Sequence, residues 1–98
     1  MKLGDIDLID NKDEHSYELW VEKKRSFINY NLQNNQSVLL HTEVPEELQD
    51  RGIAAALVEK TFQYLESKNM KVVPICSYIR TYLKQNPKWN HLVANNSN

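Results

Sequence analysis

One thiol is the side chain of this sequence best suited to nucleophilic chemistry. Cys76 is the only cysteine, and it lies between an apolar run at residues 71–75 and residues 78–85, whose pattern predicts a helix that Ser77 can cap. Because a helix N-terminus favours the thiolate, Cys76 is a candidate nucleophile. A lone cysteine is also commonly a buried structural residue, so both interpretations stay open.

Two further groups could move protons. His41 and Glu43 alternate along a predicted strand and therefore share one face of it. A histidine beside a carboxylate can deprotonate an ammonium group, although His41 could equally form only a hydrogen bond to a neighbour. Tyr78 and Tyr82 are four residues apart on the last predicted helix, so their hydroxyls can share a face or pack at the edge of the core.

The turn at residues 49–54 has the outline of an anion-binding site. It joins a predicted strand at residues 37–44 to a predicted helix at residues 52–68, and it contains Gly52, the second of two glycines. The N–H groups of a first helical turn lack intrahelical partners and carry partial positive charge, so a phosphate fits there. On this pattern alone, Gly52 could also do no more than begin the helix.

Three blocks of sequence resemble one family. The Gln49-x-x-Gly52-x-Ala54 turn, with Val44-Pro45 upstream, resembles the acyl-CoA-binding motif of the GNAT superfamily of N-acetyltransferases. The blocks at residues 41–45 (HTEVP) and 73–78 (VPICSY) are similar to those of its small, single-domain members. The similarity covers nearly the whole chain and is strongest from His41 to Val93.

The resemblance implies acetyl-CoA as the acyl donor and a set of residues that hold it. The main chain of Glu43 and Val44 is expected to contact the pantetheine arm of CoA. The pyrophosphate is expected on the N–H groups of a continuous stretch: Gln49, Asp50, Arg51, Gly52, Ile53 and Ala54. The Arg51 side chain could add a phosphate contact or remain solvated.

The resemblance also implies catalytic roles. Tyr82 resembles the tyrosine that many members use as a general acid toward the CoA thiolate, and His41 is the candidate base. Cys76 could accept the acetyl group and pass it on, or only line the site while the amine attacks directly. The expected function is N-acetyl transfer from acetyl-CoA to a primary amine. The alternative is a non-catalytic module that binds CoA or acetyl-CoA and acts through a partner protein.

The alternation of apolar residues predicts the supporting elements. Strands are expected at residues 5–11, 16–23, 26–32 and 37–44, then the helix, a strand at residues 71–75 and the last helix. The order β-β-β-β-α-β-α is an α/β (α+β) class with a mixed sheet, because the helix between the last two strands makes them parallel. It looks like a trimmed GNAT fold, and that resemblance implies that the parallel strands splay apart. No room exists between residues 11 and 16 for the two helices usual in the family, so the acceptor site should be open or completed by another chain, such as a second copy in a homodimer.

Composition sets the remaining expectations. The 98 residues predict one domain at residues 1–94 and a frayed tail at residues 95–98. A net charge of −1 provides no basic surface for nucleic acid or membranes. The absence of an apolar leader and the single cysteine favour a cytoplasmic protein. His15 and His91 lack partners at metal-ligand spacing, so no metal site is expected.

Overall fold

A computed structural model describes residues 2–94, which form one five-stranded sheet in the order β1-β2-β3-β4-β5. The strands are β1 (Ile9–Asn11), β2 (Ser16–Val21), β3 (Lys24–Gln33), β4 (Gln36–Glu43) and β5 (Lys71–Pro74). Neighbours pair antiparallel except β4 and β5, which are parallel as the intervening helix predicts. The α/β class, the element order and the mixed sheet are therefore confirmed.

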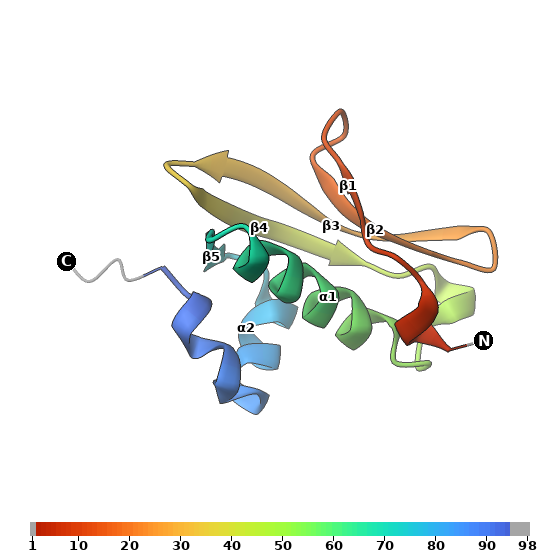
Figure 1. Cartoon of the computed structure of the whole chain (residues 1–98). Helices are drawn as coiled ribbons and strands as arrows, with labels where there is room; N and C mark the ends of the chain where they lie inside the picture. The colour runs from red at the N-terminus through yellow and green to blue at the C-terminus, as the bar shows by residue number, and fades with distance from the viewer. Residues whose placement is uncertain (1, 95–98) are drawn as a thin grey trace.

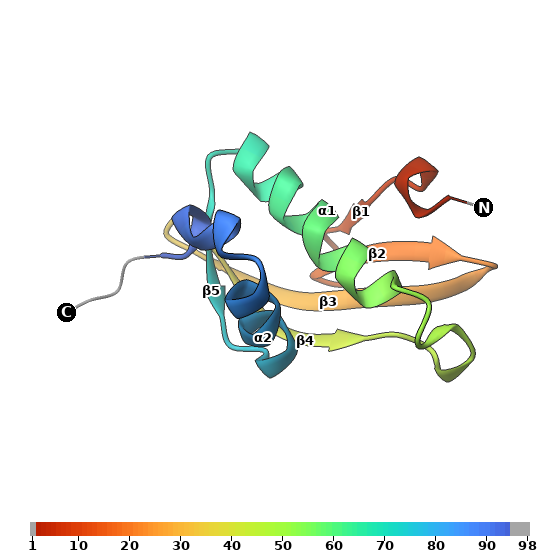
Figure 2. The same cartoon turned by 90° about the horizontal axis from the view of Figure 1, so that it is seen from below.

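The helices lie on one side of the sheet. Figures 1 and 2 show α1 (Ile53–Ser67) crossing beneath the strands, and α2 (Ser77–Gln85) lying near β4 and β5. The apolar face of α1 is buried, with Leu57, Val58 and Phe62 at 0% exposure. Asn69, the first residue after the C-cap, has a left-handed φ of 58°, which ends α1. Within residues 2–94, no element covers the opposite side of the sheet, which we call the outer face.

Two boundaries in the first half differ from the sequence prediction. Residues 5–8 are not strand: a short 3-10 helix, η1 (Leu3–Asp5), precedes β1, which pairs with β2 only from Ile9 to Asn11. The β2–β3 turn consists of Glu22 and Lys23, both with positive φ, so Lys24 and Arg25 belong to β3 and not to the hairpin tip. A two-residue turn with left-handed backbone matches the twist of the flanking strands.

The last segment adds an element that the sequence pattern did not reveal. A 3-10 helix, η3 (Pro87–Leu92), follows α2 and buries Trp89 against Phe62 of α1, with ring centroids 5.6 Å apart. Val93 then forms a parallel bridge to Val72 on the free edge of β5. The predicted tail at residues 95–98 lies outside the described residues.

A cluster of polar side chains around Glu18 connects β1, β2 and β3 on the outer face of the sheet. On the outer face Glu18 is only 3% exposed, and it accepts hydrogen bonds from Arg25 (2.7 Å), Ser16 (2.8 Å), Trp20 and Asn11. Burial alone would raise the pKa of Glu18, but these donors together lower it. Glu18 is buried on the face opposite the core because neighbouring side chains on the same face cover it.

The feature that creates the site is the separation of β4 from β5. Their pairing runs from Gln36–Lys71 to Leu39–Pro74 and then stops, and the N–H groups of Ile75 and Cys76 both donate to the Leu39 carbonyl at 3.0 Å. The pairing of β4 with β3 shifts at the same point, since Asn29 pairs with His41 and Tyr30 with Leu39. The irregularity leaves Leu40 without a partner on β3, and an extra residue of this kind bends the strand that contains it.

Candidate functional site

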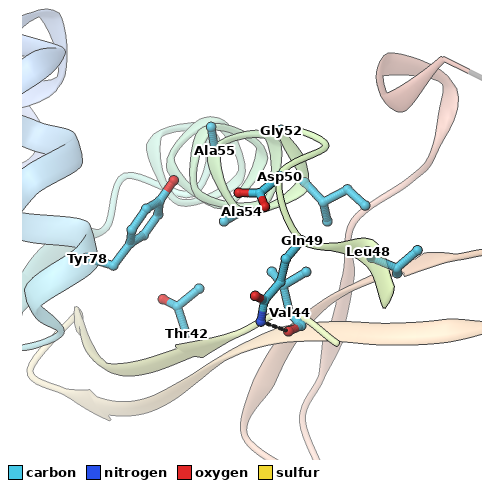
Figure 3. Close-up of a pocket in the computed structure, with 10 residues that line it drawn as sticks. Thr42, Val44, Leu48, Gln49, Asp50, Gly52, Ala54, Ala55 and Tyr78 are labelled. Atoms are coloured by element: carbon cyan, nitrogen blue, oxygen red, sulfur yellow. Dashed lines mark hydrogen bonds between the residues drawn. The ribbon is translucent and has the colours of Figure 1, made fainter. Parts of the chain in front are cut away.

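A pocket of about 420 Å³ lies between the end of β4 and the beginning of α1. Figure 3 shows Thr42 of β4, Val44 just after β4 and Tyr78 of α2 around it, with the 49–54 turn closing its other end. The lining comes from three segments: Thr42, Val44, Leu48, Gln49, Asp50, Gly52, Ile53, Ala54, Ala55 and Tyr78. The pocket therefore joins the predicted phosphate turn to the point where β4 and β5 separate.

The first turn of α1 presents unpaired donors to this pocket. The first hydrogen bond of the helix runs from the Ala56 N–H to the Gly52 carbonyl at 3.1 Å, so the preceding N–H groups have no acceptor within the helix. Gly52, the N-cap, has a left-handed φ of 77°, and a Cβ built there meets no heavy atom within 4 Å. Unpaired N–H groups beside the small Ala54 and Ala55 side chains make this end of the pocket favourable for an anionic group.

The family resemblance implied that the six N–H groups of residues 49–54 bind the pyrophosphate, but one of these groups has another partner in the structure. The Gln49 N–H donates to the Glu46 carbonyl at 3.2 Å, at the end of the 3-10 helix η2 (Glu46–Leu48). The Gln49 side chain donates to the Val44 carbonyl at 3.1 Å, drawn as the dashed line in Figure 3. Gln49 thus joins the turn to the end of β4, and its main chain is not a free donor.

Two charged residues of the turn point in different directions. The Arg51 guanidinium binds the Glu22 carboxylate of the β2–β3 hairpin at 2.6 and 3.3 Å, and Arg51 does not line the pocket. Asp50, with φ 64°, does line it and brings a carboxylate close to the proposed anion position. A like charge opposes phosphate binding, so the main-chain donors rather than side-chain charge make this end favourable for an anion.

Thr42 and Tyr78 line the other end of the pocket, and Cys76 adjoins it through Thr42. The Thr42 hydroxyl oxygen lies 3.4 Å from the Cys76 Sγ, and Tyr78 follows two residues later on α2. Cys76 is the N-cap of α2, replacing Ser77 in the predicted role, and it is 8% exposed. Burial, and to a lesser extent Cys76, raise the pKa of Tyr78, so its hydroxyl keeps its proton at neutral pH.

Tyr82, the predicted general acid, lies outside this pocket. Its side chain is 6% exposed and packs on Phe62, and its hydroxyl donates to Glu59 of α1 at 3.2 Å. Burial and the Glu59 carboxylate raise the pKa of Tyr82 to about 12. Tyr78 and Tyr82 are one turn apart, but only Tyr78 lines the pocket, whereas the Tyr82 hydroxyl is bound to Glu59 of α1.

His41 and Glu43 lie on the outer face of β4. Their residue partners on β3 are Asn29 and Phe27, whereas Thr42 between them pairs with the buried Ile28. The His41 Nε2 and Glu43 Oε1 atoms are 3.2 Å apart, and both side chains are 60% exposed. The structure therefore brings Thr42, Cys76 and Tyr78 together, and it places the His41–Glu43 pair across the strand from them.

Comparison with known proteins connects this geometry to a family. Residues 16–92 match the family model described as GCN5-related N-acetyl-transferase. The chain belongs to the GCN5-related N-acetyltransferase family. A solution structure of a protein from Staphylococcus aureus described as GCN5-like superposes with a TM-score of 0.68, at 20% identity, over 96% of this chain and 91% of that one. This likeness supports the GNAT fold.

Relatives of similar sequence are named Protein NATD1. The proteins from Xenopus tropicalis and Homo sapiens are each 39% identical over 49 residues, which is 50% of this chain and 45% and 43% of theirs. The chain thus spans less than half the length of these two relatives in the match. The protein from Danio rerio is 31% identical over 84 residues, 72% of this chain and 76% of its own length.

Sequence reasoning gave no role to Thr42 and preferred Tyr82 to Tyr78. The alternation of β4 contains the signal for Thr42, because it shares a face with Val44, the residue next to the turn. No comparable signal separates the two tyrosines. Which hydroxyl faces the pocket depends on how α2 packs against Phe62 and Glu59 of α1.

Proposed function

We propose that the chain transfers an acetyl group from acetyl-CoA to a primary amine. The observation that carries the proposal is the continuous pocket from the unpaired N–H groups of α1 to Thr42 and Tyr78, where β4 and β5 separate. The pyrophosphate would occupy the α1 end, with the Gly52, Ile53 and Ala54 N–H groups as donors. The acyl arm would then lie along Val44 toward the Thr42 end, which is the order of groups in an acyl-CoA.

Proton transfer in this proposal involves opposite faces of β4. Only a neutral amine attacks a carbonyl, so a base must first remove a proton from the ammonium form. His41, supported by the Glu43 carboxylate at 3.2 Å, is the proposed base and faces an amine that approaches from the uncovered outer face. Tyr78 is the proposed donor to the departing CoA thiolate, in place of Tyr82, because Tyr78 lines the pocket.

Two routes fit the pocket. In direct transfer, the amine nitrogen bonds to the thioester carbonyl carbon, the carbon–sulfur bond breaks, and the thiolate of CoA takes a proton. In the covalent route, the Cys76 sulfur, as a thiolate, attacks the thioester carbonyl carbon of acetyl-CoA, and CoA leaves as its thiolate. The amine nitrogen then attacks the acetyl-cysteine carbonyl carbon, and the Cys76 thiolate is released. Cys76 adjoins the pocket end through Thr42, but with 8% exposure it requires a small movement to reach a substrate.

A second candidate function is a CoA- or acetyl-CoA-binding module that acts through a partner. The uncovered outer face favours it, because residues 2–94 build no wall around an acceptor amine next to His41. In that case the binding pocket is the same, but acetyl transfer requires the second protein. The partner would complete the acceptor site.

One set of measurements tests these alternatives. The protein is mixed with acetyl-CoA, its intact mass is recorded, and its thermal stability is followed with and without CoA, for the wild type and Cys76→Ser. A one-acetyl adduct that only the wild type forms supports the covalent route. Stabilisation by CoA without an adduct supports direct transfer or simple binding, and turnover of amines then separates those two. No stabilisation at saturating CoA refutes the proposed function, since a ligand of the native state must raise its apparent stability.

A further inference from the structure

An apolar strip lies on the outer face, along the line where β4 and β5 separate. Its members alternate with residues whose side chains are buried on the α1 side of the sheet, so they point away from the core. In β4 these buried neighbours are Ser37 and Leu39, and in β5 the buried neighbour is Val72. The apolar strip consists of four residues: Val38, Leu40, Val73 and Ile75.

Two members of the strip stand where the pairing of the strands ends. The last pair is Leu39–Pro74, so Leu40 and Ile75 are the first residues beyond it, one on each side. Their exposed fractions are 38% and 50%, on the face that no element of residues 2–94 covers (Figures 1 and 2). An amine that approaches the pocket from the outer face at this point therefore meets apolar side chains from both strands.

The strip adjoins the proposed base. Leu40 is the extra residue in the pairing of β3 with β4, and His41 follows it on the same face, 3.2 Å from Glu43. Toward β3, the ring of Phe27 is already covered by the Arg25 guanidinium, 4.0 Å from the ring centroid. The strip is therefore the open apolar surface beside His41.

The charges around the strip favour an acceptor with a single ammonium group. In β3, β4 and β5 the only acidic residue is Glu43, beside His41. Cations lie on the side of β5, where Lys71 begins the strand and the Arg80 guanidinium donates to the Ile75 carbonyl at 2.6 Å. A second ammonium over the strip would lose hydration and would be repelled by these cations.

We propose that the acceptor is a monoamine with an apolar body, whose nitrogen lies at His41 and Glu43 and whose hydrocarbon part lies on the apolar strip. Leu40 and Ile75 are then specificity-determining residues, because they remove hydrocarbon from water. The inference rests on the proposed function and names the substrate class of that same site. By either route, an alkylammonium ion and acetyl-CoA give the N-alkylacetamide, CoA and one proton.

Three amines test the proposal: ethylamine, hexylamine and hexane-1,6-diamine. Ethylamine and hexylamine share the reacting group and differ in hydrocarbon, whereas the diamine has the chain of hexylamine with a second ammonium. The release of CoA is followed at saturating acetyl-CoA. We expect kcat/KM for hexylamine to exceed that for ethylamine roughly tenfold, because the additional methylenes are partly buried. The diamine should react roughly tenfold less well than hexylamine.

Two variants locate the apolar body. Leu40→Ser and Ile75→Thr should each lower the ratio of the hexylamine to the ethylamine kcat/KM by roughly threefold to tenfold. Leu32→Ser is the matched control, because Leu32 is an exposed leucine that pairs with Ser37, near the opposite end of β4 from His41. It should leave the ratio unchanged. Thermal stabilisation by CoA verifies that each variant is folded and binds the cosubstrate.

The outcomes are separable. Equal kcat/KM for ethylamine and hexylamine, or a diamine that matches hexylamine, overturns the inference while acetyl transfer itself stands. A ratio that Leu32→Ser lowers as much as Leu40→Ser also overturns it. If light scattering shows a dimeric wild type and a monomeric Leu40→Ser, the strip is an interface between two copies, and the inference is wrong. No release of CoA with any of the three amines refutes the proposed function, and the inference with it.

Discussion

Replacement of Gly52 by alanine is the most direct test of the phosphate end of the pocket, and the chain provides its own control. Gly52 has φ 77°, whereas Gly4, the other glycine, does not have a left-handed backbone, and at both positions an added Cβ meets nothing within 4 Å. Gly52→Ala and Gly4→Ala therefore add the same methyl group to open space, and only one of them strains the backbone.

The stability effect follows from the backbone. A left-handed residue with a Cβ costs about 1–2 kcal/mol, and the lower entropy of the unfolded alanine chain offsets roughly 0.4–1 kcal/mol of that. We expect a net loss of about 1 kcal/mol for Gly52→Ala, a fall in Tm of roughly 4–8 °C for a domain of this size. Gly4→Ala should leave Tm unchanged or slightly higher. Thermal unfolding followed by circular dichroism checks both.

The binding effect follows from the position of the new methyl group. The Gly52 Cβ would point into the space proposed for the pyrophosphate, and displacing that group from one N–H loses a charge-assisted hydrogen bond of about 1.5–3 kcal/mol. The Kd for CoA should therefore rise roughly tenfold to a hundredfold, measured by calorimetry at a temperature where both variants are folded. A Gly52→Ala variant that binds CoA within about twofold of the Gly4→Ala control would refute the placement of the pyrophosphate, even if its Tm falls as expected.

Three other predictions address separate parts of the molecule. Asp50→Asn should lower the Kd for CoA about two- to fivefold in calorimetry by removing a like charge from a solvent-exposed pocket wall, and weaker binding would contradict that reasoning. Tyr78→Phe should lower kcat for acetyl transfer by about a hundredfold or more without changing CoA binding, whereas Tyr82→Phe should cost about 1 kcal/mol of stability and leave kcat unchanged; the reverse pattern would restore Tyr82 as the acid. Because the folded-state pKa of Glu18 is lowered from 4.5, its contribution to stability is present above that value and is lost as the pH falls through the lowered pKa. In urea unfolding, the stability difference between wild type and Glu18→Gln should therefore shrink below pH 4.5, and a difference that stays constant down to pH 2 would contradict it.

A second acidic centre should behave in the same way. Asp10 accepts hydrogen bonds from the Tyr64 and Tyr30 hydroxyls, and it forms an ion pair with Lys12 at 3.1 Å. Burial alone would raise the pKa of Asp10, but these donors together lower it. As for Glu18, the contribution of Asp10 to stability is lost as the pH falls through its lowered pKa. Acid therefore weakens the contacts of β1 as well as the outer-face cluster around Glu18.

The sequence was sufficient for most of the strands, for both α-helices and for the turn that leads into α1, because these depend on local patterns. The 3.6-residue repeat of an α-helix puts Leu57, Val58 and Phe62 on one side of α1, and these residues are buried. Gly52 and the small residues after it predicted a turn that leads into a helix, and its left-handed φ is the conformation for which glycine is suited. The parallel pairing of β4 and β5 followed from the helix between them.

None of the helices in residues 2–94 is long and apolar enough to cross a membrane. Those residues also contain no cluster of three potential ligand side chains arranged to hold a metal ion.

Tertiary structure alone decided which reactive groups meet. Alternation along β4 could not show that no element within residues 2–94 covers the outer face. The open face leaves the His41 and Glu43 side chains 60% exposed. The order of residues in α2 could not distinguish Tyr78 from Tyr82, since their positions depend on packing against Phe62 and a hydrogen bond to Glu59 of another helix. The Thr42–Cys76 contact joins residues 34 apart in the chain. Local patterns determine the conformation of each segment, whereas contacts across the sheet and between helices determine which side chains share a pocket.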